Sequence, residues 1–302
     1  MEALLVVLGY VIFIVLGQFL KLAGRLPRES AGAISTLVLY VTLPCAILKV
    51  LNGVEFNELM VLSLLAGFGI SWVLIGAAWL ICRKDGDRAK RFAMLNIPGW
   101  NIGTFGMPYT APFVTPEGFL AMCFFDAGNA IMCTGGTYAL VCSEGGPSLR
   151  EKCITIAKRL LSSGPIWTYI IAAVLMLTHT MLPDGLIRVL DIAGSANSFL
   201  AMIMIGMSVN LAIDPDHLKL FVKFLGWRYV INALFAVLLY FTLPFAEETR
   251  LALALVLQAP LPAMGIIFTM KAKLNWEAAA NLNTISILIS VVLMSTLITL
   301  FF

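Results

Sequence analysis

Residues 100–112 read WNIGTFGMPYTAP, which places an Asn, two Gly and two Pro inside the long apolar segment 90–113. Gly and Pro interrupt the hydrogen bonding of a helix, and in hydrocarbon a freed backbone group costs several kcal/mol unless protein or water satisfies it. The stretch therefore predicts an interrupted membrane helix whose unpaired backbone groups face other parts of the protein or a water-filled cavity.

The composition places this stretch in a polytopic, all-α membrane protein. The 302 residues are 60% hydrophobic and 12% charged, whereas a soluble domain carries about 25% charged residues, and the mean hydropathy is +0.95. Segment 3–24 follows an acidic start and is too long for a signal-peptide core, so we expect a retained span. The six Cys form no CxxC pair and have no His at ligand spacing, so we expect no metal site and no cofactor.

Ten apolar segments are each long enough to cross the hydrocarbon core of a bilayer, about 30 Å. We therefore expect ten transmembrane helices, at 3–24, 31–51, 59–82, 90–113, 117–142, 165–181, 186–212, 220–244, 250–271 and 276–302.

The Lys and Arg residues indicate how these spans are oriented. All but Lys49, Arg188 and Arg250 lie on or beside the connections that follow odd-numbered spans. The positive-inside rule places those connections in the cytoplasm and both termini outside, in a protein of the cytoplasmic membrane. This assignment counts Arg228, near the start of segment 220–244, with the connection between spans seven and eight, and it treats no basic residue as lying inside a span.

The two halves of the chain resemble each other. A basic linker, 144–164, separates five spans in 1–143 from five in 165–302. A shift of 160 residues superposes Glu117 on Glu277, after the N-cap residues Thr115 and Asn275, and it also superposes the Pro-interrupted fourth and ninth spans. Because five is odd, the second half must cross the membrane in the opposite sense, which predicts an inverted repeat.

Interrupted helices at corresponding positions of two inverted halves are the best sequence pointer to the substrate site of a secondary transporter. Each break exposes N–H groups on one half-helix, which attract anions, and C=O groups on the other. A Pro kink filled in by Ser, Thr or water is the alternative for a single span; two matched breaks, each beside an Asn or Gln, favour a site. The predicted substrate-binding residues are Asn101, Gly103, Gly106 and Pro108 in the first half, and Gln258, Pro260 and Pro262 in the second.

Asp126 is the acidic residue that this assignment places well inside a span. A charged side chain at the bilayer centre costs about 2.5–3.5 kcal/mol on insertion scales, so such a residue often marks proton or cation coupling. Desolvation among Phe124, Phe125 and Met132 should favour its neutral form. The alternative is a structural acid held by neighbours such as Asn129, which we include as a second coupling candidate.

Other polar or small residues inside spans are secondary candidates, although hydrogen bonding between helices is an alternative role for each polar one. They are Thr42 and Pro44, which we expect to break span two, Gly206 at the comparable place in span seven, Ser208, Asn281 and Asn283.

The motifs Asn101-x-Gly103-x-x-Gly106-x-Pro108 and Gln258-Ala-x-Leu-Pro262, together with five plus five spans and a central basic linker, resemble the auxin efflux carrier family over the whole chain. This family includes bacterial malonate-type permeases and plant PIN exporters. The resemblance implies a fold similar to bile-acid sodium symporters, with broken helices 4 and 9 crossing, and export or exchange of small organic anions. Trp100 stands where plant carriers place Pro, and Ala263 stands where many relatives carry a polar residue. The resemblance therefore does not identify the substrate of this chain.

The sequence favours a carrier over two other classes. A membrane enzyme would need a catalytic constellation, and we find no HExxH motif and only two His; a sensor would need a partner to supply its output domain. Within carriers, we expect a proton-linked or potential-driven permease for mono- or dicarboxylates, with a sodium-coupled organic-anion importer as the alternative. The expected partners are a small organic anion, the lipid bilayer and protons or sodium, with no nucleic acid; a homodimer is left open.

Overall fold

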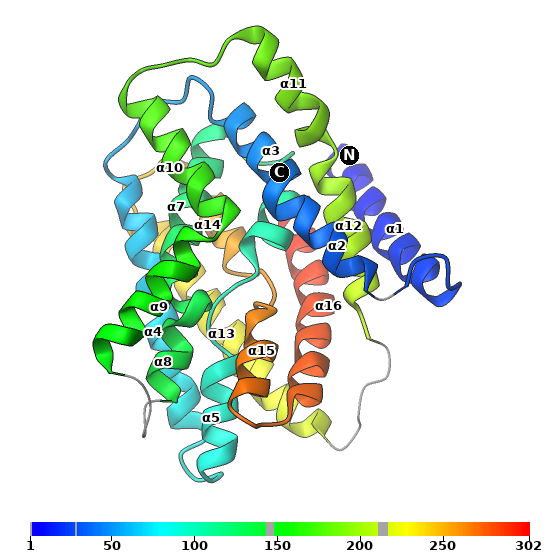
Figure 1. Cartoon of the computed structure of the whole chain (residues 1–302), viewed down its shortest axis with the longest axis vertical. Helices are drawn as coiled ribbons and strands as arrows, with labels where there is room; N and C mark the ends of the chain where they lie inside the picture. Colours follow the sequence, from blue (N-terminus) through cyan, green and yellow to red (C-terminus); the bar gives the residue numbers. More distant parts are fainter. Residues whose placement is uncertain (1, 28, 143–147, 211–216) are drawn as a thin grey trace.

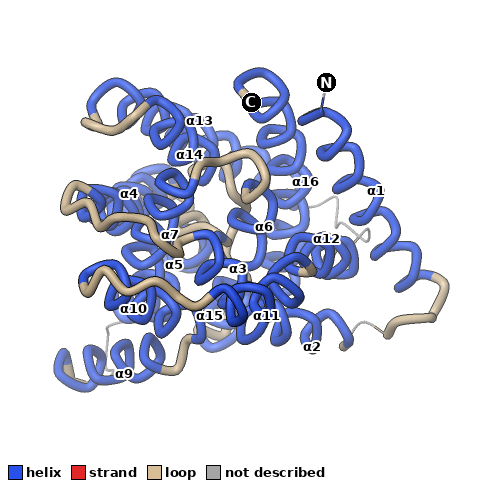
Figure 2. Tube along the Cα trace, turned by 90° about the horizontal axis from the view of Figure 1, so that it is seen from above, coloured by secondary structure: helices blue, strands red, loops and turns tan. Residues whose placement is uncertain are grey.

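The computed structural model describes residues 2–27, 29–142, 148–210 and 217–302, and within these ranges every regular element is a helix. Both ends of the chain lie at the same end of the elongated molecule (Figure 1). In the view from above, α6 (Met107–Thr110) lies inside the bundle, whereas α1 (Glu2–Leu22), α9 (Leu149–Leu161) and α13 (Leu218–Thr242) lie at its periphery (Figure 2). The all-α prediction is confirmed.

Seven helices of the described chain are long and apolar enough to cross a membrane, or eight if one bent pair counts as a single span. The bent pair is α9 with α10 (Gly164–Leu177), at 73°. The seven spans are α1; α2 (Ser30–Leu37) with η1 (Val38–Thr42) and α3 (Leu43–Val50); α4 (Met60–Ile81); α7 (Pro116–Ile131) with η3 (Met132–Gly136) and α8 (Thr137–Val141); α11 (Asp184–Ser195) with α12 (Asn197–Ser208); α13; and α16 (Trp276–Phe301).

The expected fourth and ninth spans are each divided into pieces too short to cross alone. In the fourth, α5 (Asp87–Asn96) ends before η2 (Ile102–Gly106), which continues into α6. In the ninth, α14 (Glu247–Val256) ends before α15 (Met264–Lys271). The interruptions are 97–101 and 257–263. The second contains the predicted Gln258, Pro260 and Pro262. The first begins earlier than predicted: Asn101 belongs to it, but Gly103 and Gly106 lie within the π-helical turn η2, and Pro108 lies in the first turn of α6, where its missing N–H is tolerated. We call these two stretches together the junction.

The helices that follow the two interrupted segments begin as the sequence predicts. The Thr115 side chain accepts a hydrogen bond from the Gly118 N–H at the start of α7 (3.2 Å), and the Asn275 side chain accepts one from the Ala278 N–H at the start of α16 (2.9 Å). Each cap satisfies a donor that would otherwise be unpaired in the first turn. The two caps stand at positions related by the 160-residue shift.

Glycines allow two pairs of helices to pack closely. A Cβ on Gly67 of α4 would overlap the Phe125 carbonyl of α7, and one on Gly128 of α7 would overlap the Leu64 carbonyl of α4. Gly206 of α12 similarly meets the Ile14 carbonyl of α1. Small residues bring helices together in membranes, where apolar burial supplies little driving force.

The expectation that Thr42 and Pro44 break span two is wrong. The helix runs from Ser30 to Val50 with one wide π-helical turn, η1, and Pro44 lies in the first turn of α3, where its missing N–H is tolerated.

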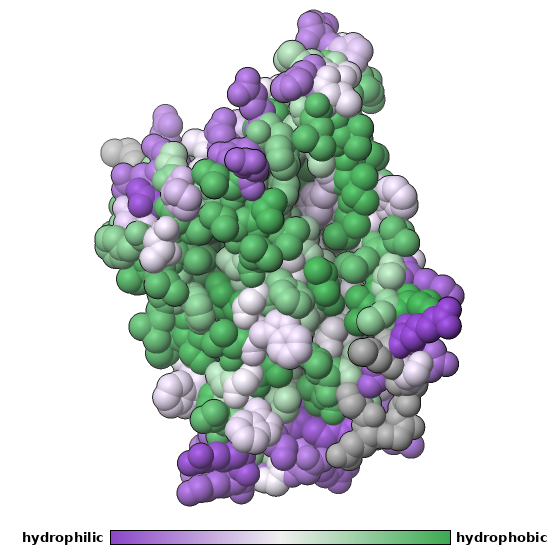
Figure 3. Space-filling model, turned by 90° about the vertical axis from the view of Figure 1, so that its left-hand side faces the viewer, coloured by the Kyte–Doolittle hydropathy of each residue, from purple (hydrophilic) through white to green (hydrophobic). Residues whose placement is uncertain are grey.

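The surface matches a membrane protein. On the face that Figure 3 shows, a broad apolar region lies between two polar ends, and exposed large side chains such as Leu5, Val222 and Phe241 contribute to the apolar surface. A belt of this kind is what lipid requires of a polytopic protein.

Candidate functional site

The two interruptions contact each other through their backbones. The Asn101 N–H donates to the Pro260 carbonyl oxygen at 2.8 Å. Trp100 and Leu261, on either side of this bond, are buried, with 1% and 2% of their surface exposed. The junction therefore unites predicted binding residues from the two halves of the chain.

The first interruption is held by Asn129 of α7. Its Oδ1 accepts the Trp100 N–H at 3.1 Å, and its Nδ2 donates to the Trp100 carbonyl at 2.9 Å. The same Nδ2 lies 3.1 Å from Asp126 Oδ1, and the Cys133 thiol donates to Oδ1 at 3.0 Å. Asn129 thus replaces the helical hydrogen bonds that residue 100 lacks.

The second interruption is held in a similar way by α16. The Leu261 N–H donates to Ser286 Oγ at 3.0 Å, and Asn283 Nδ2 donates to the Leu261 carbonyl at 2.8 Å. Tyr229 of α13 supports Ser286, because its hydroxyl lies 3.0 Å from Ser286 Oγ and 2.9 Å from the Ser286 carbonyl. Polar side chains of the next span thus satisfy both backbone groups of one junction residue in each half, one side chain in the first half and two in the second.

One face of the junction remains accessible. Asn101, Gly103, Thr104 and Pro262 are half-buried, in contrast to the buried residues around them. The Thr104 hydroxyl donates to Asn101 Oδ1 at 2.6 Å and fixes the amide at the start of η2. A Cβ on Gly103 would lie 3.5–3.6 Å from Leu43 and Leu39, so this face is directed toward span two. The arrangement offers an amide and the amino end of a half-helix to a ligand.

Asp126 lies beside this framework and is connected to α10. Its Oδ2 accepts the Tyr169 hydroxyl at 2.8 Å, and its Oδ1 accepts Asn129 Nδ2. The carboxyl group thus joins the Asn129 amide, which holds the first interruption, to a helix of the second half. Sequence reasoning missed Tyr169, because a single Tyr in an apolar segment is typical of a membrane helix.

Arg228 corrects the expectation that no basic residue lies inside a span. It belongs to α13, between Leu218 and Thr242, and is 0% exposed. Its Nη1 donates to the Ile97 carbonyl and its Nη2 to the Ala259 carbonyl at 3.2 Å. One turn further on, Asn232 Nδ2 donates to the Leu257 carbonyl at 2.7 Å. The signal for both residues is their spacing of four on an apolar helix. We had assigned Arg228 to the flank of a connection, and Asn232 was not among the candidates.

The other predicted residues have mixed placements. Gly106 and Pro108 are buried: the Gly106 N–H donates to the Asn101 carbonyl at 3.0 Å, and the Pro108 carbonyl accepts the Ser198 hydroxyl at 2.7 Å. Gln258 is buried within the second interruption.

The secondary candidates bond mainly to other helices or to their own. Thr42 donates to Asn197 Oδ1 of α12 at 2.8 Å, and exposed Ser208 donates to the Met204 carbonyl of its own helix at 2.8 Å. Asn281 is buried in α16, and Pro44 is half-buried in α3.

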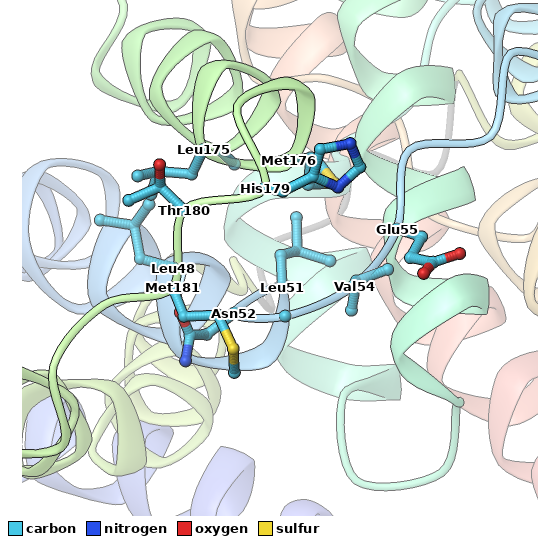
Figure 4. A pocket seen from close by; sticks show the side chains of 12 residues that line it. Leu48, Leu51, Asn52, Val54, Glu55, Leu175, Met176, His179, Thr180 and Met181 are labelled. Atoms are coloured by element: carbon cyan, nitrogen blue, oxygen red, sulfur yellow. The ribbon is translucent and has the colours of Figure 1, made fainter.

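Cavities open at the end of the molecule that carries the termini. One of 860 Å³ is lined by acidic residues among others, including Glu55, Glu58 and Glu117. A smaller one of 180 Å³ lies between the end of α3 and the end of α10, where His179 and Glu55 line it with Leu51 and Met176 (Figure 4). The described residues hold no cluster of His, Cys, Asp or Glu suited to a metal ion.

Two interrupted segments joined inside a multi-pass helical bundle are typical of membrane transporters. The chain belongs to the family described as "Membrane transport protein", which matches residues 2–302 and is the auxin efflux carrier family that its motifs resemble. It is 25% identical to an uncharacterized transporter of Methanothermobacter thermautotrophicus over 95% of this chain and 94% of that protein. It is 26% identical to an uncharacterized transporter of Methanocaldococcus jannaschii over 71% and 70% of the two chains.

Proposed function

We propose that this protein is a secondary carrier of small organic anions, such as mono- or dicarboxylates, in the cytoplasmic membrane. The observation that carries the proposal is the junction, in which a half-buried Asn101 and the amino end of η2 face span two. Neutral donors suit a carrier, because it must release the anion that it binds.

The proposed architecture is two inverted five-span repeats, 1–143 and 165–302, joined by a cytoplasmic linker at 144–164, with both termini outside the cell. The matched interruptions, the matched caps and the two side-chain clamps on Trp100 and Leu261 support it. The junction then lies near the bilayer midplane, where such carriers bind their substrates.

In the proposed mechanism, the domain that contains the junction moves relative to a scaffold domain, so that the junction faces each side of the membrane in turn. Asp126 couples this movement to a proton, because its bond to Tyr169 joins the junction's clamp to α10. The membrane potential is the other available driving force for an anion.

Counterflow in proteoliposomes tests the proposal. Vesicles containing the purified protein are loaded with an unlabelled mono- or dicarboxylate, and uptake of the labelled anion is followed with and without a pH gradient. We expect accumulation that a neutral amide analogue does not produce. Equal uptake by protein-free vesicles, across a panel of carboxylates, would contradict the proposal.

A further inference from the structure

Arg228 connects the two interruptions from the side of α13. Its guanidinium donates to the carbonyl of Ile97, the first residue after α5, and to the carbonyl of Ala259, which lies between α14 and α15. A single side chain thus binds a backbone oxygen from each interruption. The Ile97 oxygen lies at the carbonyl end of α5, where the helix dipole is negative, and the Ala259 oxygen is an unwound backbone carbonyl beyond the end of α14.

Among the described residues, the charge of Arg228 has no carboxylate partner. Within the described ranges, no Asp or Glu lies within ion-pair distance of its guanidinium. The group instead lies over the rings of Trp100, at 5.6 Å, and Tyr229, at 6.0 Å. Because guanidinium stays protonated in proteins and a buried charge is costly without partners, the carbonyl ends and the ring faces must supply its stabilisation.

Carriers with broken helices commonly use the same type of oxygen to bind a coupling ion, since unwound carbonyls and half-helix carbonyl ends coordinate Na⁺. In this chain Arg228 already occupies carbonyls of both interruptions. We propose that Arg228 is a built-in cation that takes the place of a coupling metal ion at the junction, so that the folded carrier neither binds nor requires Na⁺ there. This inference rests on the proposed function only in placing the substrate site at the same junction.

The fixed cation also has an electrostatic consequence. Arg228 adds a fixed positive charge to the partial positive charge at the amino ends of η2 and α15, near Asn101 and Pro262. The junction is then positive without any bound ion, which suits an anion and opposes a cation.

The first test uses the wild-type protein without any substrate. Thermal unfolding and binding of radioactive sodium are measured in detergent, with choline replacing Na⁺ at constant ionic strength. We expect the same Tm in both salts and no saturable sodium binding. Saturable binding, or a Tm that rises with the logarithm of the Na⁺ concentration, would overturn the proposal.

The second test removes the side chain. In Arg228→Ala the carbonyls of Ile97 and Ala259 lose their donors, so the variant should unfold several degrees lower, and Na⁺ or guanidinium, but not choline, should restore part of the loss. Arg228→Lys keeps a cation and should stay insensitive to Na⁺. A folded Arg228→Ala that responds to neither ion contradicts the inference; if that variant does not fold, the wild-type sodium measurement still decides.

Arg250→Ala is the matched control. Arg250 also donates to a backbone carbonyl, that of Tyr240 at 2.9 Å, and lies over the Tyr240 ring at 4.9 Å, but it contacts neither interruption through these bonds. Its loss should lower Tm with no specific response to Na⁺ or guanidinium. None of these measurements uses a transported anion, so they remain valid even if no substrate is found. If they contradict the role of Arg228, the counterflow experiment still tests the proposed function separately.

Discussion

The side chain of Asn129 binds Trp100 by both of its backbone groups, accepting from the N–H at 3.1 Å and donating to the C=O at 2.9 Å. A buried backbone group without a partner costs about 1–3 kcal/mol. We expect Asn129→Ala to lower the free energy of unfolding by about 2–4 kcal/mol, since two groups lose their partner. Thermal unfolding in detergent measures the effect.

Thr299→Ala provides the comparison for Asn129→Ala. Thr299 is exposed on α16, and its hydroxyl donates only to the Ser295 carbonyl of its own helix. Its removal should leave Tm unchanged. Equal values of Tm for both variants would show that the Asn129 clamp contributes nothing to stability.

Asn101 is the side chain that the proposed function places against the substrate. A hydrogen bond to a charged group is worth about 1.5–3 kcal/mol, so Asn101→Ala should raise the apparent Kd of a transported carboxylate tenfold or more. Competition binding to the purified protein measures the change. Ser208→Ala, whose hydroxyl donates within its own helix, should bind as the wild type does; unchanged affinity in a folded Asn101→Ala protein rules out the contact.

Gly206 of α12 is a packing residue in this structure. A Cβ at this position would overlap the Ile14 carbonyl of α1, and overpacking costs about 1–3 kcal/mol. We therefore expect Gly206→Ala to lower Tm. Gly9→Ala on α1 is the control, because no heavy atom lies within 4 Å of the added Cβ and Ala is the better helix former; it should leave Tm equal or higher.

The interruptions were predictable because their signals are local. Pro disfavours the interior of a helix, as at Pro98 and Pro260, and Thr115 and Asn275 cap the helices that follow. Asn129 could be suspected from its place beside Asp126. The sequence does not reveal which backbone groups the Asn129 amide binds, because that depends on how α7 packs against the first interruption.

Arg228 shows why the other contacts of the junction could not be predicted from the sequence. Counting it with the connection between spans seven and eight was reasonable under the positive-inside rule, which sorts basic residues by connection. Its burial depends on carbonyls from residues 97 and 259, which are far away in sequence and become available only when both helices are interrupted at the same place. Tyr169 was missed for a similar reason, since its partner Asp126 lies on another helix.

Variants of Asp126 and Tyr169 distinguish the proposed coupling role of Asp126 from a purely structural role. Asp126→Asn keeps the shape and hydrogen-bonding capacity of the carboxyl group but cannot titrate, so it should abolish accumulation driven by a pH gradient while leaving substrate-for-substrate exchange largely intact, because exchange moves no net proton. Tyr169→Phe removes the 2.8 Å hydrogen bond and leaves the carboxyl able to titrate, so it should retain gradient-driven accumulation at a changed rate. Both transport modes are measured in the same vesicles. Accumulation by Asp126→Asn at the wild-type rate would eliminate the coupling role and leave Asp126 as a structural link between α7 and α10.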